Sequence, residues 1–117
     1  MRIVLLANTV FEAGVGFVMI FIPTLFLNST NELVFAVGRS LGFASASIAV
    51  LSFSMLLKKP NKTFLSMGFT TLTVFHVGLT VSQLINFVEW LSPLYMVIIH
   101  AVFAGASAVY LVKSLRN

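Results

Sequence analysis

The sequence of 117 residues contains no cysteine and few charged residues. Without cysteine, the chain cannot form disulfides or perform the thiol redox chemistry of membrane quinone-linked thiol oxidoreductases. This absence leaves the compartment unmarked. Charged residues make up only 9% of the chain and just three residues are acidic, whereas about a quarter of the residues in soluble domains are charged. The composition therefore argues against a soluble domain.

Most of the chain is apolar: 59% of its residues are hydrophobic and its mean hydropathy is +1.06. A membrane-spanning helix needs about 20 apolar residues, and four windows qualify, at residues 3–27, 33–57, 64–88 and 94–112. We predict an all-α membrane protein, a four-transmembrane-helix up-down bundle in which residues 1–117 form a single integral membrane domain. Pro23 should kink the first helix or end it early, because proline lacks a backbone N–H.

The first window differs from a secretory signal, although Arg2 precedes its apolar run. The apolar region of a signal is about 7–15 residues long. This window is longer and contains Asn8 and Glu12, so we interpret it as a mature helix.

Basic residues gather on one side of the predicted bundle, whereas the connections at 28–32 and 89–93 contain none. A bias of lysine and arginine in short loops sets membrane orientation, so we expect both termini to be cytoplasmic. The basic residues on this side are Arg2, Lys58, Lys59, Lys62, Lys113 and Arg116. Because they lie at helix ends and are not interleaved with exposed aromatic residues, we expect the partner to be a lipid bilayer and not a nucleic acid.

Each predicted helix contains one ionisable residue deep in its apolar run: Glu12, Arg39, His76 and His100. Such residues are costly in hydrocarbon and normally face the interior of a bundle, where they find partners. Counted from the cytoplasmic end, their depths are roughly 13 Å for Glu12, 18 Å for His76 and 20 Å for Arg39 and His100. We therefore predict a polar centre with a Glu12–Arg39 ion pair and two neutral histidines. The alternative for Arg39 is a position near the outer interface, to which its long side chain would snorkel.

The third helix carries a polar strip that should face this centre. Thr73, His76, Thr80 and Gln83 follow spacings of three and four, and Phe69 and Phe87 continue the same stripe. Side chains at these spacings share one helix face. We expect Gln83 and, on the first helix, Asn8 to extend the polar network. The predicted ligand-binding residues are Glu12, Arg39, His76, His100, Asn8, Gln83, Thr73 and Thr80.

Small residues mark predicted contact lines between helices. Gly38, Gly42 and Ala46 repeat every four residues in the second helix, and Gly16 continues the line of Asn8 and Glu12 in the first. Ala101 with Gly105, and Ala104 with Ala108, form two lines in the fourth. Such lines pack helices within one chain or form an oligomer seam, so a homo-oligomer or a larger membrane complex stays open as a partner.

Glu12, His76 and His100 are ligand types for zinc or non-haem iron. However, no two of them share a local spacing such as i, i+4, and haem ligation by both histidines needs matching depth and facing. We therefore assign no metal to the predicted site and leave the cofactor unknown.

Two stretches resemble small four-helix bacterial membrane proteins of the DoxX-like group. The first helix reads Phe11-Glu12-Ala13-Gly14-Val15-Gly16 followed by Ile22-Pro23, and the second opens Gly38-Arg39-Ser40-Leu41-Gly42. The resemblance implies the four-helix fold, a bacterial inner (plasma) membrane and association with membrane redox or quinone partners. It identifies no activity, so whether the chain is an enzyme stays open.

The chain is also similar to the small multidrug resistance transporters in length, helix count and a lone glutamate in the first helix, which Glu12 matches. This resemblance implies exchange of protons for lipophilic cations. The one-sided basic residues depart from it, because dual topology needs near balance, and Arg39 would compete for the glutamate.

The leading hypothesis is a polar site that binds a lipophilic small molecule or cofactor. The alternatives are a non-catalytic structural or accessory subunit and a proton-coupled exporter that uses Glu12.

Overall fold

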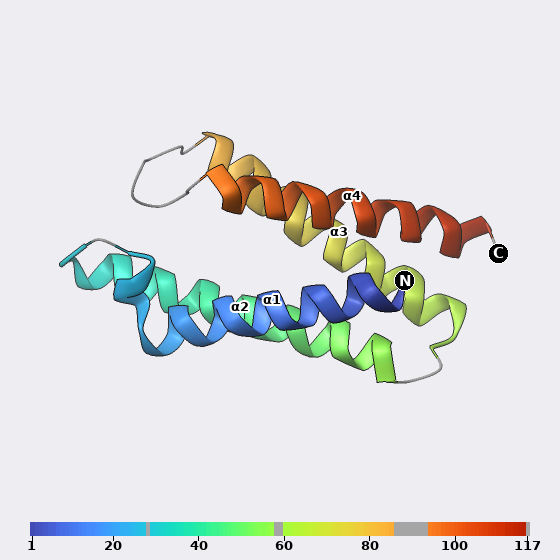
Figure 1. Ribbon diagram of the computed structural model, residues 1–117, viewed down its shortest axis with the longest axis horizontal. Coiled ribbons are helices and arrows are strands. Elements are labelled where there is room, and N and C mark those ends of the chain that lie inside the picture. The colour runs from blue at the N-terminus through green and yellow to red at the C-terminus, as the bar shows by residue number, and fades with distance from the viewer. Residues whose placement is uncertain (28, 58–59, 86–93, 117) are drawn as a thin grey trace.

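The computed structural model describes residues 1–27, 29–57, 60–85 and 94–116. These residues form four long helices, and consecutive helices run in opposite directions (Figure 1). The predicted all-helical, up-down arrangement is therefore confirmed within the described ranges. In chain order the elements are α1 (Arg2–Phe21), the short 3-10 helix η1 (Pro23–Leu25), α2 (Glu32–Leu57), α3 (Lys62–Ile85) and α4 (Leu94–Arg116).

Capping residues, proline and charge set the observed helix ends, which differ by a few residues from the bounds of the apolar windows. Helix α1 ends at Phe21, short of the predicted residue 27, because Pro23 cannot continue the hydrogen-bond ladder and restricts the residue before it. Helix α3 starts at Lys62, two residues before its predicted start, where the Asn61 side chain accepts the N–H of Phe64. Helix α4 continues to Arg116, beyond the predicted residue 112, because basic residues are favourable in a last turn.

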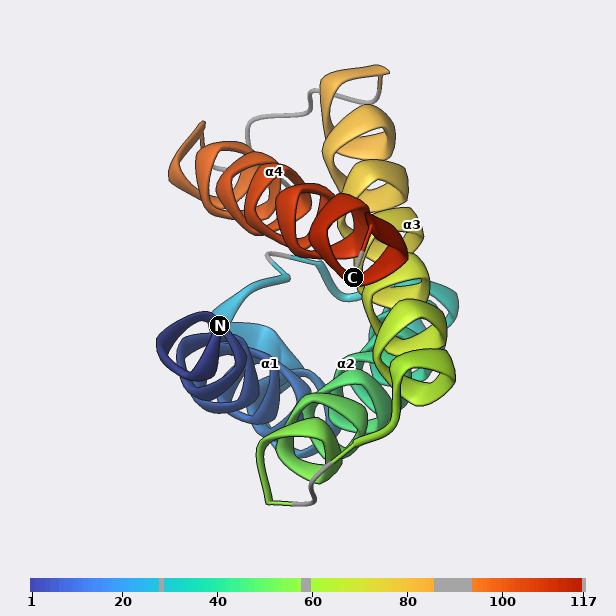
Figure 2. The same ribbon diagram turned by 90° about the vertical axis from the view of Figure 1, so that its right-hand side faces the viewer.

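The four helices form two hairpins, α1 with α2 and α3 with α4, which contact each other sparingly (Figures 1 and 2). The first hairpin packs closely because small residues meet at its crossing. A Cβ atom on Gly16 would lie 2.9 Å from the carbonyl oxygen of Gly42. The predicted contact line of α2 therefore operates within the chain. On α4, Ala104 is buried, whereas Ala101 and Gly105 are exposed.

Polar and apolar side chains are distributed in the reverse of the pattern in soluble proteins. Large apolar side chains such as Val10, Phe43, Val74 and Val102 are exposed on all four helices. Each helix is long and apolar enough to cross a membrane. Among the described residues, seven polar or ionisable side chains are buried: Asn8, Glu12, Ser45, Ser52, His76, His100 and Ser107. The interior of this fold is therefore where polar chemistry is concentrated.

An apolar cluster lies between the hairpins, on the side of the buried polar residues nearer the chain ends. Its buried members are Leu5, Ile48, Met55, Phe69 and Leu72. Asn8 follows Leu5 by about one helical turn, and His76 follows Leu72 in the same way. The cluster thus holds α1 and α3 at a register that brings their polar residues together.

Candidate functional site

Glu12, His76 and His100 meet in the interior, although they come from three different helices, α1, α3 and α4. The Nδ1 atoms of the two histidines lie 3.0 Å apart. Glu12 Oε1 lies 3.8 Å from His76 Nδ1 and 3.9 Å from His100 Nδ1. All three side chains are almost completely buried. We call these three residues the Glu-His-His centre.

Asn8 fixes the orientation of His76. The Asn8 amide nitrogen donates to Ser52 Oγ at 2.7 Å, so its carbonyl oxygen is free to accept. That oxygen lies 2.7 Å from His76 Nε2, which must therefore carry a proton. In a neutral His76 the Nδ1 atom is then a lone pair that faces His100 and Glu12. The chain Ser52–Asn8–His76–His100 connects all four helices.

The carboxylate of Glu12 has no conventional partner. Both of its oxygens are buried, and neither accepts a hydrogen bond within the described part of the chain. A buried carboxylate without donors is costly, so such a group normally pairs with a cation or coordinates a metal. The two imidazoles lie just outside hydrogen-bond range, and the carboxylate is therefore the unsatisfied element of the centre.

Aromatic rings close the sides of the Glu-His-His centre. The ring of Phe11 meets His100 edge to face at a centroid distance of 5.5 Å, and Phe103 stacks on His76 at 5.2 Å. Such contacts favour one ring orientation. Together with the Asn8 bond they leave the imidazoles little freedom, so the centre is preorganised.

The structure does not pair Glu12 with Arg39. Arg39 is exposed on α2, and among the described residues only the two histidines lie within ion-pair distance of Glu12. The reason lies one residue earlier, where Gly38 is buried against Met19 and Leu27. Successive residues of a helix point about 100° apart, so burial of Gly38 turns Arg39 outward. The predicted Glu12–Arg39 pair is therefore not formed, and of the four ionisable residues the structure brings together Glu12, His76 and His100.

The polar residues of the α3 strip lie on one partly or fully buried face, as predicted, but their side chains have different hydrogen-bond partners. The hydroxyl groups of Thr73 and Thr80 donate to the carbonyl oxygens of Phe69 and His76 in their own helix. They therefore do not extend the network between helices. The carbonyl oxygen of the Gln83 side chain is buried and accepts no hydrogen bond from the described residues. Phe87 lies outside the described residues.

A cavity of about 150 Å³ adjoins the centre and is lined by His100, Ser45 and Gln83. Its other walls are mostly apolar and include Leu41 and Leu79. The lining residues of α1, η1 and α4 place it between His100 and the end of the bundle where α1 ends and α4 begins. The cavity thus offers an apolar space with a few polar groups, one of which belongs to the centre.

Sequence reasoning did not identify two further polar residues of the interior, Ser45 and Ser52. Both are almost completely buried. Their separation of seven residues places them on one face of α2, and this face also includes Gly38 and Gly42. That spacing is the signal that marks them.

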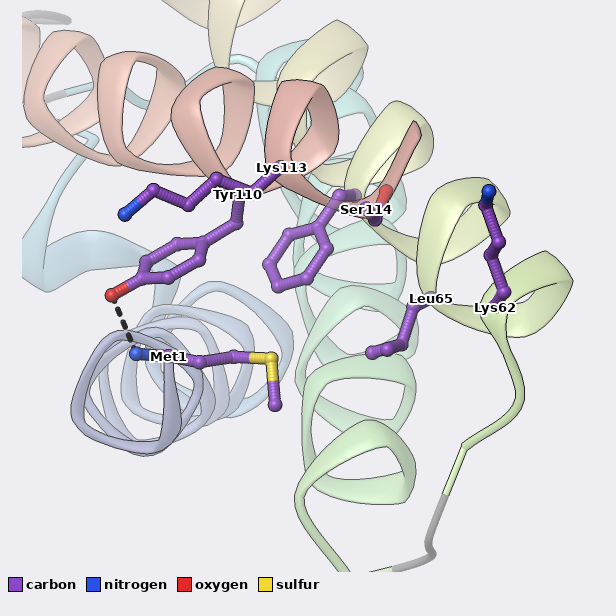
Figure 3. A pocket seen from close by; sticks show the side chains of 7 residues that line it. Met1, Lys62, Leu65, Tyr110, Lys113 and Ser114 are labelled. Atoms are coloured by element: carbon purple, nitrogen blue, oxygen red, sulfur yellow. Dashed lines mark hydrogen bonds between the residues drawn. The ribbon is translucent and has the colours of Figure 1, made fainter. Parts of the chain in front are cut away.

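A second hollow, of about 370 Å³, lies at the basic end of the bundle (Figure 3). Lys62 and Lys113 lie on opposite sides of it, and the amino group of Met1 donates to the hydroxyl of Tyr110. Leu65 and Phe69 contribute apolar surface. None of the predicted site residues lines this hollow, so it is separate from the centre.

Comparison with known proteins adds no assignment. No protein-family model matches the chain, and neither do the curated proteins or the solved structures with which it was compared. The resemblances to the DoxX-like group and to the small multidrug resistance transporters therefore stay predictions.

Proposed function

We propose that this chain is an integral membrane protein that binds a lipophilic small molecule beside the Glu-His-His centre. The observation that carries this proposal is the position of His100, which belongs to the buried centre and also lines the apolar cavity. Small-molecule sites are mostly apolar, with a few polar groups that orient the ligand. This cavity has that composition.

The distribution of side chains supports the membrane part of the proposal. Exposed apolar residues on every helix suit contact with lipid tails, and polar residues in the interior suit helix association by hydrogen bonds. Arg2, Lys62, Lys113 and Arg116 lie at one end of the bundle. By the bias of positive residues toward the cytoplasm, that end and both chain termini would face the cytoplasm of a bacterial plasma membrane.

The cavity restricts the head group of the ligand. An engineered cavity of about 150 Å³ in another protein holds benzene, so a single six-membered ring is the size that fits here. The side-chain carbonyl oxygen of Gln83 has no donor among the described residues, and a donor group on that ring would satisfy it. A ring that carries a hydroxyl group and an apolar tail meets both requirements.

Co-purification tests the proposal. The protein is extracted in mild detergent, and its organic extract is analysed by mass spectrometry for a ring-containing lipophile enriched over bulk lipid. Gln83→Leu keeps the side-chain size but removes the amide, and loss of one hydrogen bond of about 1 kcal/mol should lower occupancy roughly fivefold. The neighbouring Ser82→Ala is the control, because Ser82 is exposed and does not line the cavity.

Absence of an enriched molecule from the parent protein, or full retention by Gln83→Leu, would refute ligand binding. Either result would favour a structural or accessory subunit, in which the polar centre only holds the helices in register. The bond between Asn8 and His76 favours this alternative, because it joins the two hairpins, and the bond from Asn8 to Ser52 holds α1 and α2 together within the first.

A further inference from the structure

We infer that the Glu-His-His centre holds one divalent first-row transition-metal ion, with Glu12 Oε1, His76 Nδ1 and His100 Nδ1 as its protein ligands. This inference goes beyond the proposed binding of a lipophilic molecule and does not depend on it. It also revises the expectation from sequence, which assigned no metal because the three residues share no local spacing.

The distances between the ligand atoms carry the inference. Their separations of 3.0, 3.8 and 3.9 Å define a triangle. The point equidistant from its three corners lies about 2.1 Å from each, which is the length of zinc–nitrogen and zinc–oxygen bonds. An ion at that point would leave positions for further ligands on either side of the plane.

The hydrogen bonds of His76 suit metal binding, and the ion would displace the proton that His100 Nδ1 donates to His76 Nδ1. His76 donates its Nε2 proton to Asn8, which leaves its Nδ1 lone pair directed at the centre. A histidine that ligates a metal almost always donates its other N–H to an oxygen acceptor. Asn8 is itself held by Ser52. The outer support that metal sites require is therefore already built around His76.

The charge balance points the same way. Both oxygens of Glu12 are buried, and among the described residues neither has a hydrogen-bond donor and Arg39 forms no ion pair with them. A divalent ion would compensate the carboxylate and would take the place of the proton that the two Nδ1 atoms share. Two nitrogen ligands and one oxygen ligand favour zinc, iron or a related ion, whereas calcium and magnesium prefer all-oxygen sites. The direct contact of the rings leaves no space for a porphyrin between them.

Metal analysis of the purified full-length protein tests the inference. Protein stripped with a chelator is given one equivalent of Zn²⁺, Fe²⁺ or Mn²⁺, passed over a desalting column and analysed by inductively coupled plasma mass spectrometry. We expect about one ion per chain for at least one of these metals, and none for Mg²⁺ or Ca²⁺. Co²⁺ should give the visible absorption bands of a site with nitrogen and oxygen ligands.

Variants separate ligation from folding. Glu12→Gln and His100→Ala should each weaken metal affinity at least tenfold, and Asn8→Leu should weaken it by about 10–100-fold as an outer-shell change. Asn8→Asp should retain the ion, because the carboxylate of the new side chain can still accept the hydrogen bond from His76 Nε2. Ser107→Ala, which alters a buried serine elsewhere on α4, is the matched control.

The inference is overturned if the stripped parent protein takes up none of the three metals and gives no Co²⁺ bands. It is equally overturned if Glu12→Gln and His100→Ala retain the parent's affinity. The parent result decides the question even where a variant fails to fold. Gln83→Leu should keep the ion while its occupancy by the lipophilic molecule falls, so the two proposals can fail separately.

Discussion

Asn8 makes the sharpest test of how the two hairpins are joined. Its side chain donates to Ser52 on α2 and accepts from His76 on α3, both at 2.7 Å. Asn8→Leu removes both bonds while keeping a side chain of similar size. Hydrogen bonds between membrane helices average about 0.6 kcal/mol and reach about 1.7 kcal/mol. The loss of two should therefore lower the free energy of unfolding by roughly 1–3 kcal/mol.

The neighbouring residue supplies the control. Thr9 is half-buried on the same helix, but its hydroxyl donates to the carbonyl oxygen of Leu5 within α1. Thr9→Val should change the free energy of unfolding by less than about 0.5 kcal/mol, because a bond to the helix's own backbone adds little. Both variants are measured by titrating the folded protein in mixed micelles with sodium dodecyl sulfate and following helix content by circular dichroism.

A double-mutant cycle decides whether the loss comes from the contact with His76. Asn8→Leu and His76→Phe should each destabilise, and the double variant should be less destabilised than the two effects combined, with a coupling of about 0.5–1.5 kcal/mol. Additivity within about 0.3 kcal/mol would mean that the two side chains do not interact. That result would refute the network on which the orientation of His76 rests.

Three further predictions concern packing, charge and orientation. Gly16→Ala should destabilise the protein by about 1–3 kcal/mol, because the new Cβ would meet backbone atoms of α2. Gly14→Ala should stabilise it by up to about 1 kcal/mol, because nothing lies within 4 Å of the new Cβ. Equal effects of the two variants in unfolding titrations would contradict the close crossing of α1 and α2. Arg39→Met should leave the free energy of unfolding within about 0.5 kcal/mol of the parent value. A loss of several kcal/mol would indicate that Arg39 forms a buried ion pair with Glu12. Impermeant amine reagents should reach Lys62 only from the cytoplasmic side, and a cysteine introduced at Ser29 should label only from outside; labelling of both from both sides would favour the exporter alternative.

The sequence alone determined the helical class, the number of apolar helices and most members of the polar centre. Apolar runs of this length form helices in lipid because every backbone polar group must be satisfied within the segment. Glu12, His76 and His100 could be named in advance because ionisable residues in such runs face the interior. The stripe on α3 could also be predicted, since its polar residues contrast with their surroundings at spacings of three and four.

Tertiary structure decided which of these residues meet. A helix that is apolar all round carries little information about which face points inward, so the outward direction of Arg39 depended on the packing of Gly38 against Leu27 and Met19. The triangle of Glu12, His76 and His100 joins residues up to 88 positions apart, and its edges of 3.0 to 3.9 Å are set by the register between hairpins. Spacing within one helix cannot encode that register, because it arises from side-chain packing between helices.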